Sequence, residues 1–472
     1  MKTIVSSLLL LISLSLFAKV ELPVIFTDNM VLQQQTDAPV WGKASPGKTV
    51  EIVTSWDNQK YTVKAAADGS WKTNLKTGAA GGPYSITISD GKILELKNVM
   101  LGEVWICSGQ SNMEMPLAGW GQVLKYKEEI AAANFPDIRL LHVDRATAML
   151  PQASVKVSAG GWQVCSPATI AEFSSTAYFF GRNLHQNMNN IPIGLINTSW
   201  GGTIAEAWTS AQTLENMPAF RDAIEKVKAT LVDESPNNPN RTTVLYNAMI
   251  HPLVPYAIQG AIWYQGESNV GRAEQYSELF PLMIRDWRSQ WNRNFPFYFV
   301  QLANFQKLQT GPEESAWAEL REAQLKTLNL ENTGMAVIID IGDAVDIHPK
   351  NKQDVGNRLA LAARAKTYGQ KIPYSGPIYQ SHVIEGHQIR IRFSNTDGGL
   401  KGANNEPVKG FTIAGPDHKF YWADAKIEGN EVAVSSNNVP FPVAVRYAWA
   451  NNPVCNLYNG AGLPASPFRT NF

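Results

Sequence analysis

The chain has 472 residues, enough for about three domains at roughly 150 residues each. Its 41 basic residues balance its 41 acidic residues, so the composition gives no electrostatic reason to expect a nucleic-acid or anionic-membrane partner. Hydrophobic residues make up 44% and charged residues 17%, which is too apolar for a disordered chain. Cys107, Cys165 and Cys455 are too few for a disulfide scaffold, and their odd number leaves at least one thiol unpaired.

The first 18 residues are typical of an export signal. Lys2 gives a positive start, an apolar run extends from Ile4 to Phe17, and Ala18 is a small residue suited to a cleavage site. The run of about 14 residues is shorter than the roughly 20 needed to cross a bilayer. No later segment is long and apolar enough to do so. We therefore expect a secreted or periplasmic protein, cleaved near Ala18 and without a membrane span.

Both ends of the remaining chain have a β texture. In residues 19–100, short apolar runs are separated by turn signals such as Ser45–Gly47, which predicts an N-terminal β-sandwich domain. Residues 380–472 return to this pattern in runs such as Gln388–Phe393 and Val443–Trp449, which predicts a C-terminal β-rich domain.

Residues 101–379 alternate short apolar strands with amphipathic helices. The predicted strands are Val104–Cys107, Ile138–Leu141, Ile193–Ile196, Ala261–Tyr264, Phe297–Val300 and Ala336–Ile339. Apolar residues from Tyr276 to Trp291 recur at the spacing of one helical face. Together these patterns predict an α/β fold, an α/β/α sandwich with a mainly parallel sheet, flanked by the two β-rich regions. In such sheets the chemistry lies just beyond the carboxyl ends of the strands.

Ser111 is the candidate nucleophile. It lies in Cys107–Glu114, directly after the first predicted strand of this region. A serine in a glycine-containing strand-to-helix turn has its hydroxyl at the carboxyl edge of the sheet, near free backbone N–H groups of the helix. Such a turn can also hold a serine without catalysis. Ser108 is the neighbouring competitor, but it lies closer to the strand end and is interpreted as a turn residue.

A serine nucleophile needs a general base, and His348 is the best placed of the seven histidines. It lies in a loop between a predicted strand and a helix, with the carboxylates of Asp343 and Asp346 in reach. His142 ends another strand and is an alternative, whereas His251 precedes its strand and is interpreted as structural. No two histidines have the helical spacing of metal ligands with an acid, so no metal site is expected.

Two further strand ends supply candidate oxyanion donors. Asn197–Thr203 contains paired glycines, which let a backbone N–H approach a ligand closely. Tyr264–Asn269 has the amide of Gln265 at the rim. Each segment alone could be explained by the residue preferences of an ordinary turn. Four strand ends that together supply a nucleophile, two donors and a base are much harder to dismiss.

Four blocks in this order closely resemble the sialate O-acetylesterases and related carbohydrate acetylesterases of the SGNH hydrolase superfamily. The blocks are Gly109–Met113, Thr198–Gly202, Trp263–Asn269 and Asp346–Lys352. The resemblance covers most of the chain after the export signal, since Leu22–Gln33 and Val445–Ala450 also look familial. The combination is highly specific for the family and poorly specific for the substrate.

The resemblance implies that Ser111 is the nucleophile and His348 the general base. It further implies an oxyanion hole made by Gly202, Gln265 and the backbone N–H of Ser111. The third block reads Gln-Gly-Glu rather than a Gly-x-Asn form, so the match at Gln265 is weaker than that at Gly202.

The acid that orients His348 is not assigned by the resemblance. The superfamily's usual position, three residues before the histidine, is Val345, which cannot accept a hydrogen bond. Asp346 is the first candidate, and Glu267 and Asp343 remain open. A serine–histidine dyad, in which a backbone carbonyl holds the Nδ1 proton, is a further alternative.

The resemblance implies a serine esterase that removes O-acetyl groups from carbohydrate through an acyl-enzyme. O-acetylated sialic acids are the first candidate substrates, and acetylated xylan, xyloglucan or another plant polysaccharide is the nearest alternative. An alternative of another class is a noncatalytic glycan-binding protein. We expect no cofactor, and an O-acetylated glycan or sialic acid as the substrate; the oligomeric state is not predicted.

Overall fold

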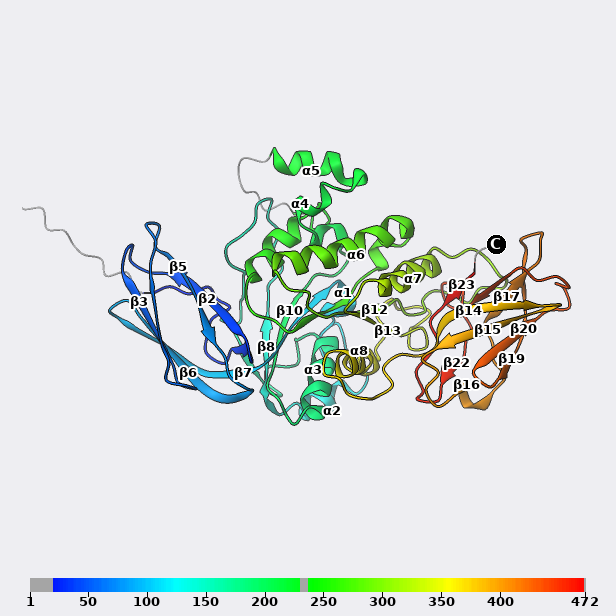
Figure 1. The fold of residues 1–472 in the computed structure, drawn as a ribbon, viewed down its shortest axis with the longest axis horizontal. Helices are drawn as coiled ribbons and strands as arrows, with labels where there is room; N and C mark the ends of the chain where they lie inside the picture. The colour runs from blue at the N-terminus through cyan, green and yellow to red at the C-terminus, as the bar shows by residue number, and fades with distance from the viewer. Residues whose placement is uncertain (1–19, 230–236, 471–472) are drawn as a thin grey trace, which may run out of the picture.

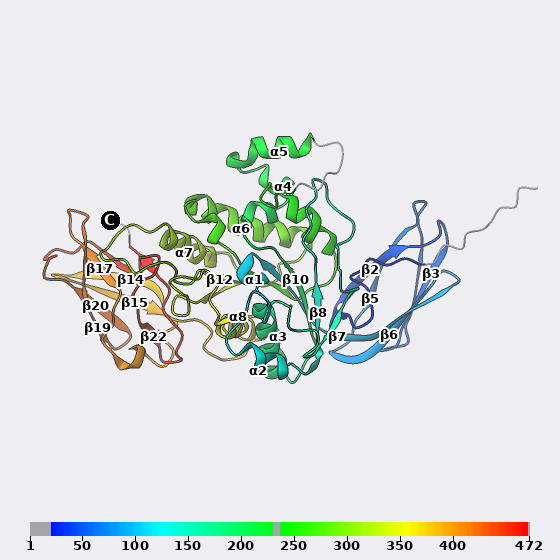
Figure 2. The same ribbon diagram turned by 180° about the vertical axis from the view of Figure 1, so that it is seen from behind.

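The computed structural model describes residues 20–229 and 237–470. The predicted export signal, residues 1–18, lies outside the described residues. The molecule is elongated, with a mixed α/β region between a β-rich region at each end (Figure 1). Figure 2 shows the same arrangement from behind.

The N-terminal region consists of short paired strands. They are β1 (Val31–Gln33), β2 (Asp37–Lys43), β3 (Thr49–Thr54), β4 (Lys60–Lys64), β5 (Ser70–Lys76) and β6 (Gly81–Ser89). Strand β2 pairs with β5, and β3 pairs with both β4 and β6. Alternate residues of β3 (Val50, Ile52 and Thr54) are buried, as expected for a strand with one face against a core.

Strand β7 (Ile93–Gly109) connects this region to the central sheet. Its first half is antiparallel to β6, and its second half lies between two parallel neighbours. The predicted domain boundary at residue 100 therefore falls inside one continuous strand. Buried apolar side chains from Val20 to Ala363 form one cluster, so the N-terminal and central regions share a core.

The central sheet has the strand order β13-β12-β11-β7-β10-β8-β9. The additional strands are β8 (Phe135–His142), β9 (Gln163–Cys165), β10 (Ile193–Ser199), β11 (Gly260–Tyr264), β12 (Phe297–Gln301) and β13 (Thr333–Val337). All the pairings from β13 to β8 are parallel, and only the short β9 is antiparallel to its neighbour among the strands of this path. Every residue of β10 to β13 is buried, because helices cover both faces of the sheet.

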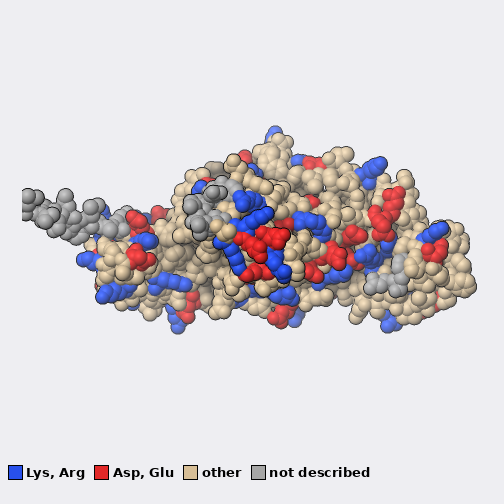
Figure 3. All heavy atoms as spheres, turned by 90° about the horizontal axis from the view of Figure 1, so that it is seen from above, with Lys and Arg blue, Asp and Glu red and all other residues tan. Residues whose placement is uncertain are grey.

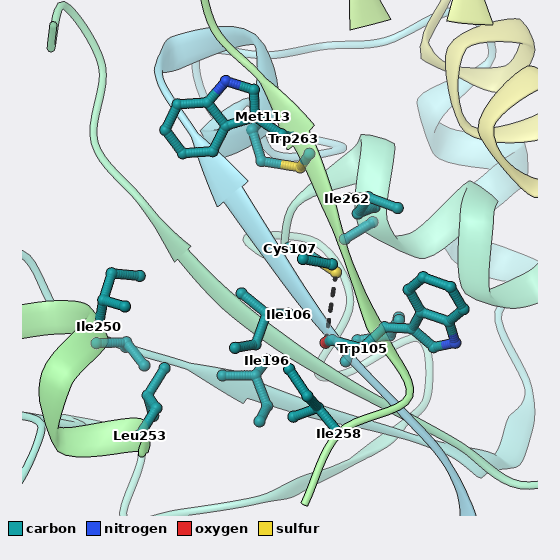
Figure 4. Close-up of a cluster of buried hydrophobic side chains, with 14 of the residues drawn as sticks. Trp105, Ile106, Cys107, Met113, Ile196, Ile250, Leu253, Ile258, Ile262 and Trp263 are labelled. Atoms are coloured by element: carbon teal, nitrogen blue, oxygen red, sulfur yellow. Dashed lines mark hydrogen bonds between the residues drawn. The ribbon is translucent and has the colours of Figure 1, made fainter. Parts of the chain in front are cut away.

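Neighbouring strands contribute apolar side chains to the sheet's core. Ile106 of β7, Ile196 of β10 and Ile262 of β11 lie close together in Figure 4, and each is completely buried. Trp105 and Trp263 extend this cluster from the same strands. The rigid packing of β7 against β10 and β11 fixes where these three strands end.

Helices lie on both faces of this sheet. Helices α3 (Ser175–Asn187) and α8 (Lys352–Lys366) pack together on one face, and α6 (Ala273–Gln290) and α7 (Ala316–Lys326) pack together on the other (Figure 1). The shorter helices are α1 (Ser111–Glu114), α2 (Tyr126–Ala131), α4 (Ala211–Leu214) and α5 (Arg221–Lys228). The predicted apolar face of α6 is buried from Tyr276 to Trp287, which confirms the helical periodicity.

The C-terminal region has its own apolar cluster. One sheet contains β14 (Ile378–Glu385), β15 (Gln388–Ser394), β19 (Asp424–Glu428) and β20 (Glu431–Ser435). A second sheet contains β17 (Phe411–Ala414), β18 (Phe420–Trp422), β21 (Ala444–Tyr447) and β23 (Phe468–Arg469). In addition, β16 (Leu400–Gly402) pairs with β22 (Leu457–Asn459). The buried Arg321 of α7 donates hydrogen bonds to the carbonyls of Ala450 and Asn451, and so ties this region to the central one.

The surface charges are mixed. Figure 3 shows basic and acidic side chains side by side on the face seen from above, without one extended area of a single sign. None of the helices in the described part of the chain is long and apolar enough to cross a membrane. The three cysteines are all unpaired. The chain is thus a mixed α/β protein with a large, mainly parallel sheet and β-rich regions at both ends.

Candidate active site

The site lies where β7, β10 and β11 end side by side. In the sheet, Gly109 of β7 is opposite Ser199 of β10 on one side and Tyr264 of β11 on the other. The segments that follow these residues therefore leave the sheet at the same edge. This brings Ser111 together with the glycine pair after β10 and the Gln-Gly-Glu segment after β11.

Gly109 makes the turn into α1 possible. Its φ is +140°, and an added Cβ would lie 2.1 Å from the carbonyl oxygen of Tyr264, so no larger residue fits there. The next residue, Gln110, donates its backbone N–H to the same carbonyl at 3.0 Å. Ser111 then begins α1 at the sheet edge, whereas Ser108 is completely buried within β7.

The Ser111 hydroxyl is in hydrogen-bond contact with His348. The distance from Ser111 Oγ to His348 Nε2 is 2.9 Å. His348 comes from the loop between β13 and α8, as expected for a residue after a strand end. Trp120 packs against the imidazole with ring centroids 5.3 Å apart, and its own side chain is 49% exposed. His142, the other strand-end histidine, contacts the Asn197 amide at 3.1 Å instead.

Asp346 is the carboxylate next to the far side of the imidazole. Its Oδ1 lies 3.3 Å from His348 Nδ1 and also accepts the backbone N–H of His348 at 2.8 Å. Lys350 Nζ lies 3.5 Å from the other carboxylate oxygen. One oxygen of Asp346 therefore contacts both the backbone and the ring of His348.

The other two candidate acids have different partners. Asp343 accepts the backbone N–H groups of Val345 and Asp346, at 2.8 and 3.2 Å, and so stabilises the turn of the loop. Glu267 accepts a 2.6 Å hydrogen bond from Asn112 Nδ2. Of the three candidates, the structure brings only Asp346 to the imidazole nitrogen that faces away from Ser111.

The surroundings of His348 favour its neutral form. Burial lowers the pKa of the imidazole below its ordinary value of 6.5, and the positive charges of Lys352 and Lys350 act in the same direction. Asp346 opposes them. Although burial acts to raise the pKa of Asp346, the His348 N–H and the charge of Lys350 hold it below its ordinary value. At neutral pH this gives an uncharged base beside an ionised carboxylate.

The loop after β10 carries two adjacent glycines with different roles. Gly201 donates its N–H to Glu114 Oε2 at 2.8 Å, and an added Cβ would lie 3.1 Å from the Cβ of Ser111. Gly202 has a φ of +74° and open space around it. Within residues 20–229 and 237–470, the N–H groups of Gly202 and Ser111 donate to no protein atom, so both can bind a ligand oxygen.

Gln265 does not occupy its predicted position in the oxyanion hole. Its side chain is completely buried, and Nε2 donates to Thr203 O at 3.1 Å and to Asn269 Oδ1 at 2.7 Å. Its Oε1 accepts a hydrogen bond from the hydroxyl of Tyr276 at 3.0 Å. Because both amide N–H groups are used inside the protein, Gln265 stabilises the loop after β10 rather than facing a substrate.

Glu114 contacts the site loops, which the sequence does not predict. Besides binding Gly201, it forms a 2.6 Å ion pair with Arg145, whose guanidinium lies 5.7 Å from the ring centroid of Trp200. Glu114 is the last residue of the segment Cys107–Glu114. It lies three residues, about one helical turn, after Ser111. Nothing in the sequence indicated that Gly201 would be its partner.

Metal binding has no support in the described part of the chain. No group of three or more histidine, cysteine, aspartate or glutamate side chains there is arranged to hold an ion.

Three comparisons relate this chain to known proteins. Residues 101–365 match the family described as carbohydrate esterase, sialic acid-specific acetylesterase. The sialate O-acetylesterase of Homo sapiens is 31% identical over 93% of this chain and 90% of its own length, and that of Mus musculus is 29% identical over 94% and 93%. A carbohydrate acetylesterase from Xanthomonas citri has 42% identity and a TM-score of 0.87, covering 96% of this chain and 99% of its own.

These matches identify the chain as a carboxylic ester hydrolase. The chain belongs to the sialic acid-specific acetylesterase family of carbohydrate esterases.

Replacing Gly201 by alanine tests the close approach of the glycine loop to Ser111. The added methyl group would press on the Ser111 side chain, and a shift of about 1 Å at a reacting group can cost about 100-fold in rate. We expect Gly201→Ala to lower kcat by about 10- to 100-fold while the protein stays folded. Initial rates on a chromogenic acetyl ester measure this. Gly311→Ala, which adds a methyl group in open space, is the control and should keep full activity.

Proposed function

We propose that this protein is a serine esterase that removes O-acetyl groups from carbohydrates through an acyl-enzyme. The observation that carries the proposal is the 2.9 Å contact between Ser111 Oγ and His348 Nε2 at the carboxyl edge of a parallel sheet. A nucleophile hydrogen-bonded to its base, with an acid at the other ring nitrogen, is the arrangement that nucleophilic ester hydrolysis requires.

The first half of the reaction acylates the enzyme. His348 Nε2 takes the proton of Ser111 as Oγ attacks the acetyl carbonyl carbon. The oxyanion that forms is stabilised by the backbone N–H groups of Ser111 and Gly202, which have no competing acceptor in the described protein. The C–O bond to the sugar then breaks, and the sugar oxygen leaves with the proton from His348.

The second half releases acetate. Water enters beside the acetyl-serine, His348 takes one of its protons, and the water oxygen attacks the carbonyl carbon. Collapse of the second tetrahedral intermediate breaks the ester bond and returns the proton to Ser111. Asp346 stabilises the imidazolium in both halves, supported by its 3.3 Å contact with Nδ1. Val345, at the superfamily's usual acid position, has no side-chain acceptor, so we assign the acid's role to its neighbour Asp346.

The substrate is an O-acetylated sugar, and O-acetylated sialic acids are our first choice because the curated relatives are sialate O-acetylesterases. Acetylated xylan, xyloglucan or another plant polysaccharide is the second choice, since the Xanthomonas citri protein is described only as a carbohydrate acetylesterase. The half-exposed indole of Trp120 beside His348 offers an apolar face for a sugar ring in either case. Acetate release from a panel of these substrates discriminates between them.

Three broader assignments accompany this proposal. The helices on both faces of the parallel sheet form an SGNH-type α/β/α sandwich. The β-rich regions, residues 19–100 and 380–472, are structural or help to shape the substrate cleft. The chain is exported after cleavage near Ala18.

Ser111→Ala should abolish turnover while the fold survives, because loss of a nucleophile costs several orders of magnitude in rate. The expected fall in kcat is at least about 1,000-fold. The matched control is Ser108→Ala, since Ser108 is the buried serine of the same segment and should be dispensable for chemistry. Substantial turnover by a folded, uncontaminated Ser111→Ala protein would contradict the proposal.

The pH dependence of kcat/KM should report His348. The active form is the neutral imidazole, so activity falls as pH drops through its pKa, and this inflection should lie below 6.5. Lys350→Met removes a positive charge and should move the inflection to higher pH. Asp346→Asn removes a negative charge and should move it to lower pH.

Asp346→Asn should also lower kcat, by up to about 10,000-fold if it fixes the correct tautomer. Asp343→Asn and Glu267→Gln are the comparison variants. Wild-type turnover in Asp346→Asn, or an inflection that moves upward, would exclude Asp346 as the acid.

A further inference from the structure

The loop that carries His348 is held by two side chains, one on each side of the histidine. Asn112 Nδ2 donates a 3.0 Å hydrogen bond to the carbonyl of Ile347, and Lys352 Nζ donates a 2.7 Å hydrogen bond to the carbonyl of Pro349. The backbone carbonyls of the residues immediately before and after His348 are thus both fixed from inside the protein.

The two side chains also bind each other. Lys352 Nζ donates to Asn112 Oδ1 at 2.8 Å, and Asn112 Nδ2 donates to Glu267 Oε1 at 2.6 Å. Asn112 directly follows Ser111, Glu267 follows β11, and Lys352 begins α8. The hydrogen bonds therefore connect the nucleophile's helix to the base's loop without passing through the reacting atoms.

This network is buried, which is an unusual environment for a lysine. Lys352 and Asn112 are 0% and 1% exposed, and Glu267 Oε2 is buried without a hydrogen-bond partner in the described protein. Burial lowers the pKa of Lys352 to about 7, opposed by the charge of Glu267, and raises the pKa of Glu267. A neutral lysine amine still has two N–H groups, one for Asn112 Oδ1 and one for the carbonyl of Pro349. Its hydrogen bonds therefore persist on both sides of that pKa.

Reaction geometry explains why the loop must be held. His348 must keep its Nε2 within hydrogen-bond reach of Ser111, yet the same loop contains the exposed Val345. Misplacing a catalytic group by about 1 Å can cost about 100-fold in rate. We propose that Lys352 and Asn112 are positioning residues, which fix His348 relative to Ser111 by binding the carbonyls of Pro349 and Ile347. The inference rests on the proposed esterase function.

Lys352→Met in the full-length protein tests the proposal. We expect kcat to fall by about 10- to 100-fold, with KM changed by less than about 2-fold, because Lys352 is completely buried and out of reach of a substrate. The rate at which a fluorophosphonate labels Ser111 should fall in parallel. Lys366→Met is the control: it removes an exposed lysine from the last turn of the same helix. A wild-type kcat in Lys352→Met would overturn the proposal.

A double variant separates positioning from stability. Lys352→Met alone leaves the Glu267 carboxylate without its buried counter-charge, which is destabilising. Adding Glu267→Gln removes that charge and keeps an acceptor for Asn112, so the thermal unfolding temperature should recover. The donor to Pro349 is still missing, so kcat should stay low. Recovery of kcat together with stability would refute a positioning role.

Amide hydrogen exchange gives a readout that does not need turnover. Exchange of residues 346–351 should accelerate in Lys352→Met and not in Lys366→Met. Unchanged exchange would overturn the proposal even if activity were lost. A wild-type protein that hydrolyses no acetyl ester would instead refute the proposed function, and the exchange result would still decide whether Lys352 holds the loop.

Discussion

The register of β7 against β10 and β11 is the constraint on which the site depends. Gly109 stands between Ser199 and Tyr264, and its missing side chain lets the backbone turn within van der Waals distance of the Tyr264 carbonyl. Gly109 also accepts the N–H of Trp200 at 3.0 Å, so one residue fixes the starting points of all three neighbouring loops. Ser111, the glycine pair and the Glu267 segment are held together because a rigid parallel sheet ends there.

Polar contacts connect the segments around this edge of the sheet to one another. Glu114 connects α1 to Gly201, and Gln265 connects the end of β11 to Thr203 and Asn269. Asp346 fixes both the backbone and the ring of His348. Buried polar groups of this kind are expensive unless they are satisfied, and satisfied networks define one conformation. By contrast, the backbone N–H groups of Ser111 and Gly202 have no acceptor among the described residues.

Much of this arrangement could be predicted from the sequence. Apolar runs and helical periodicity located the strands and α6, because burial on both faces of a sheet leaves a strong pattern. The rule that chemistry lies at strand ends paired Ser111 with His348, and the familial blocks agreed. Its spacing and its place in the Asp-Ile-His-Pro match favour Asp346 over Asp343 and Glu267, and it is the one that contacts the ring.

Other features had no local signal. The boundary at residue 100 could not be recognised as the middle of a strand, because β7 continues without a turn from one region into the next. The amide of Gln265 was expected at the rim, yet tertiary contacts with Tyr276 and Asn269 draw it inside. From the sequence alone, Lys352 is expected at the surface, because lysines are almost never fully buried unless they are paired.

Mass spectrometry of the quenched enzyme tests most directly whether Ser111 carries the acyl group, as we propose. The full-length protein would be mixed with an activated acetyl ester, quenched in acid within one turnover, digested and mapped. The mechanism requires one acetyl group on the peptide that contains Ser111, formed at the rate of the first product burst and absent from Ser111→Ala. Turnover with no acetyl group on that peptide at any quench time, or an acetyl group that forms on another residue at the burst rate, would contradict it.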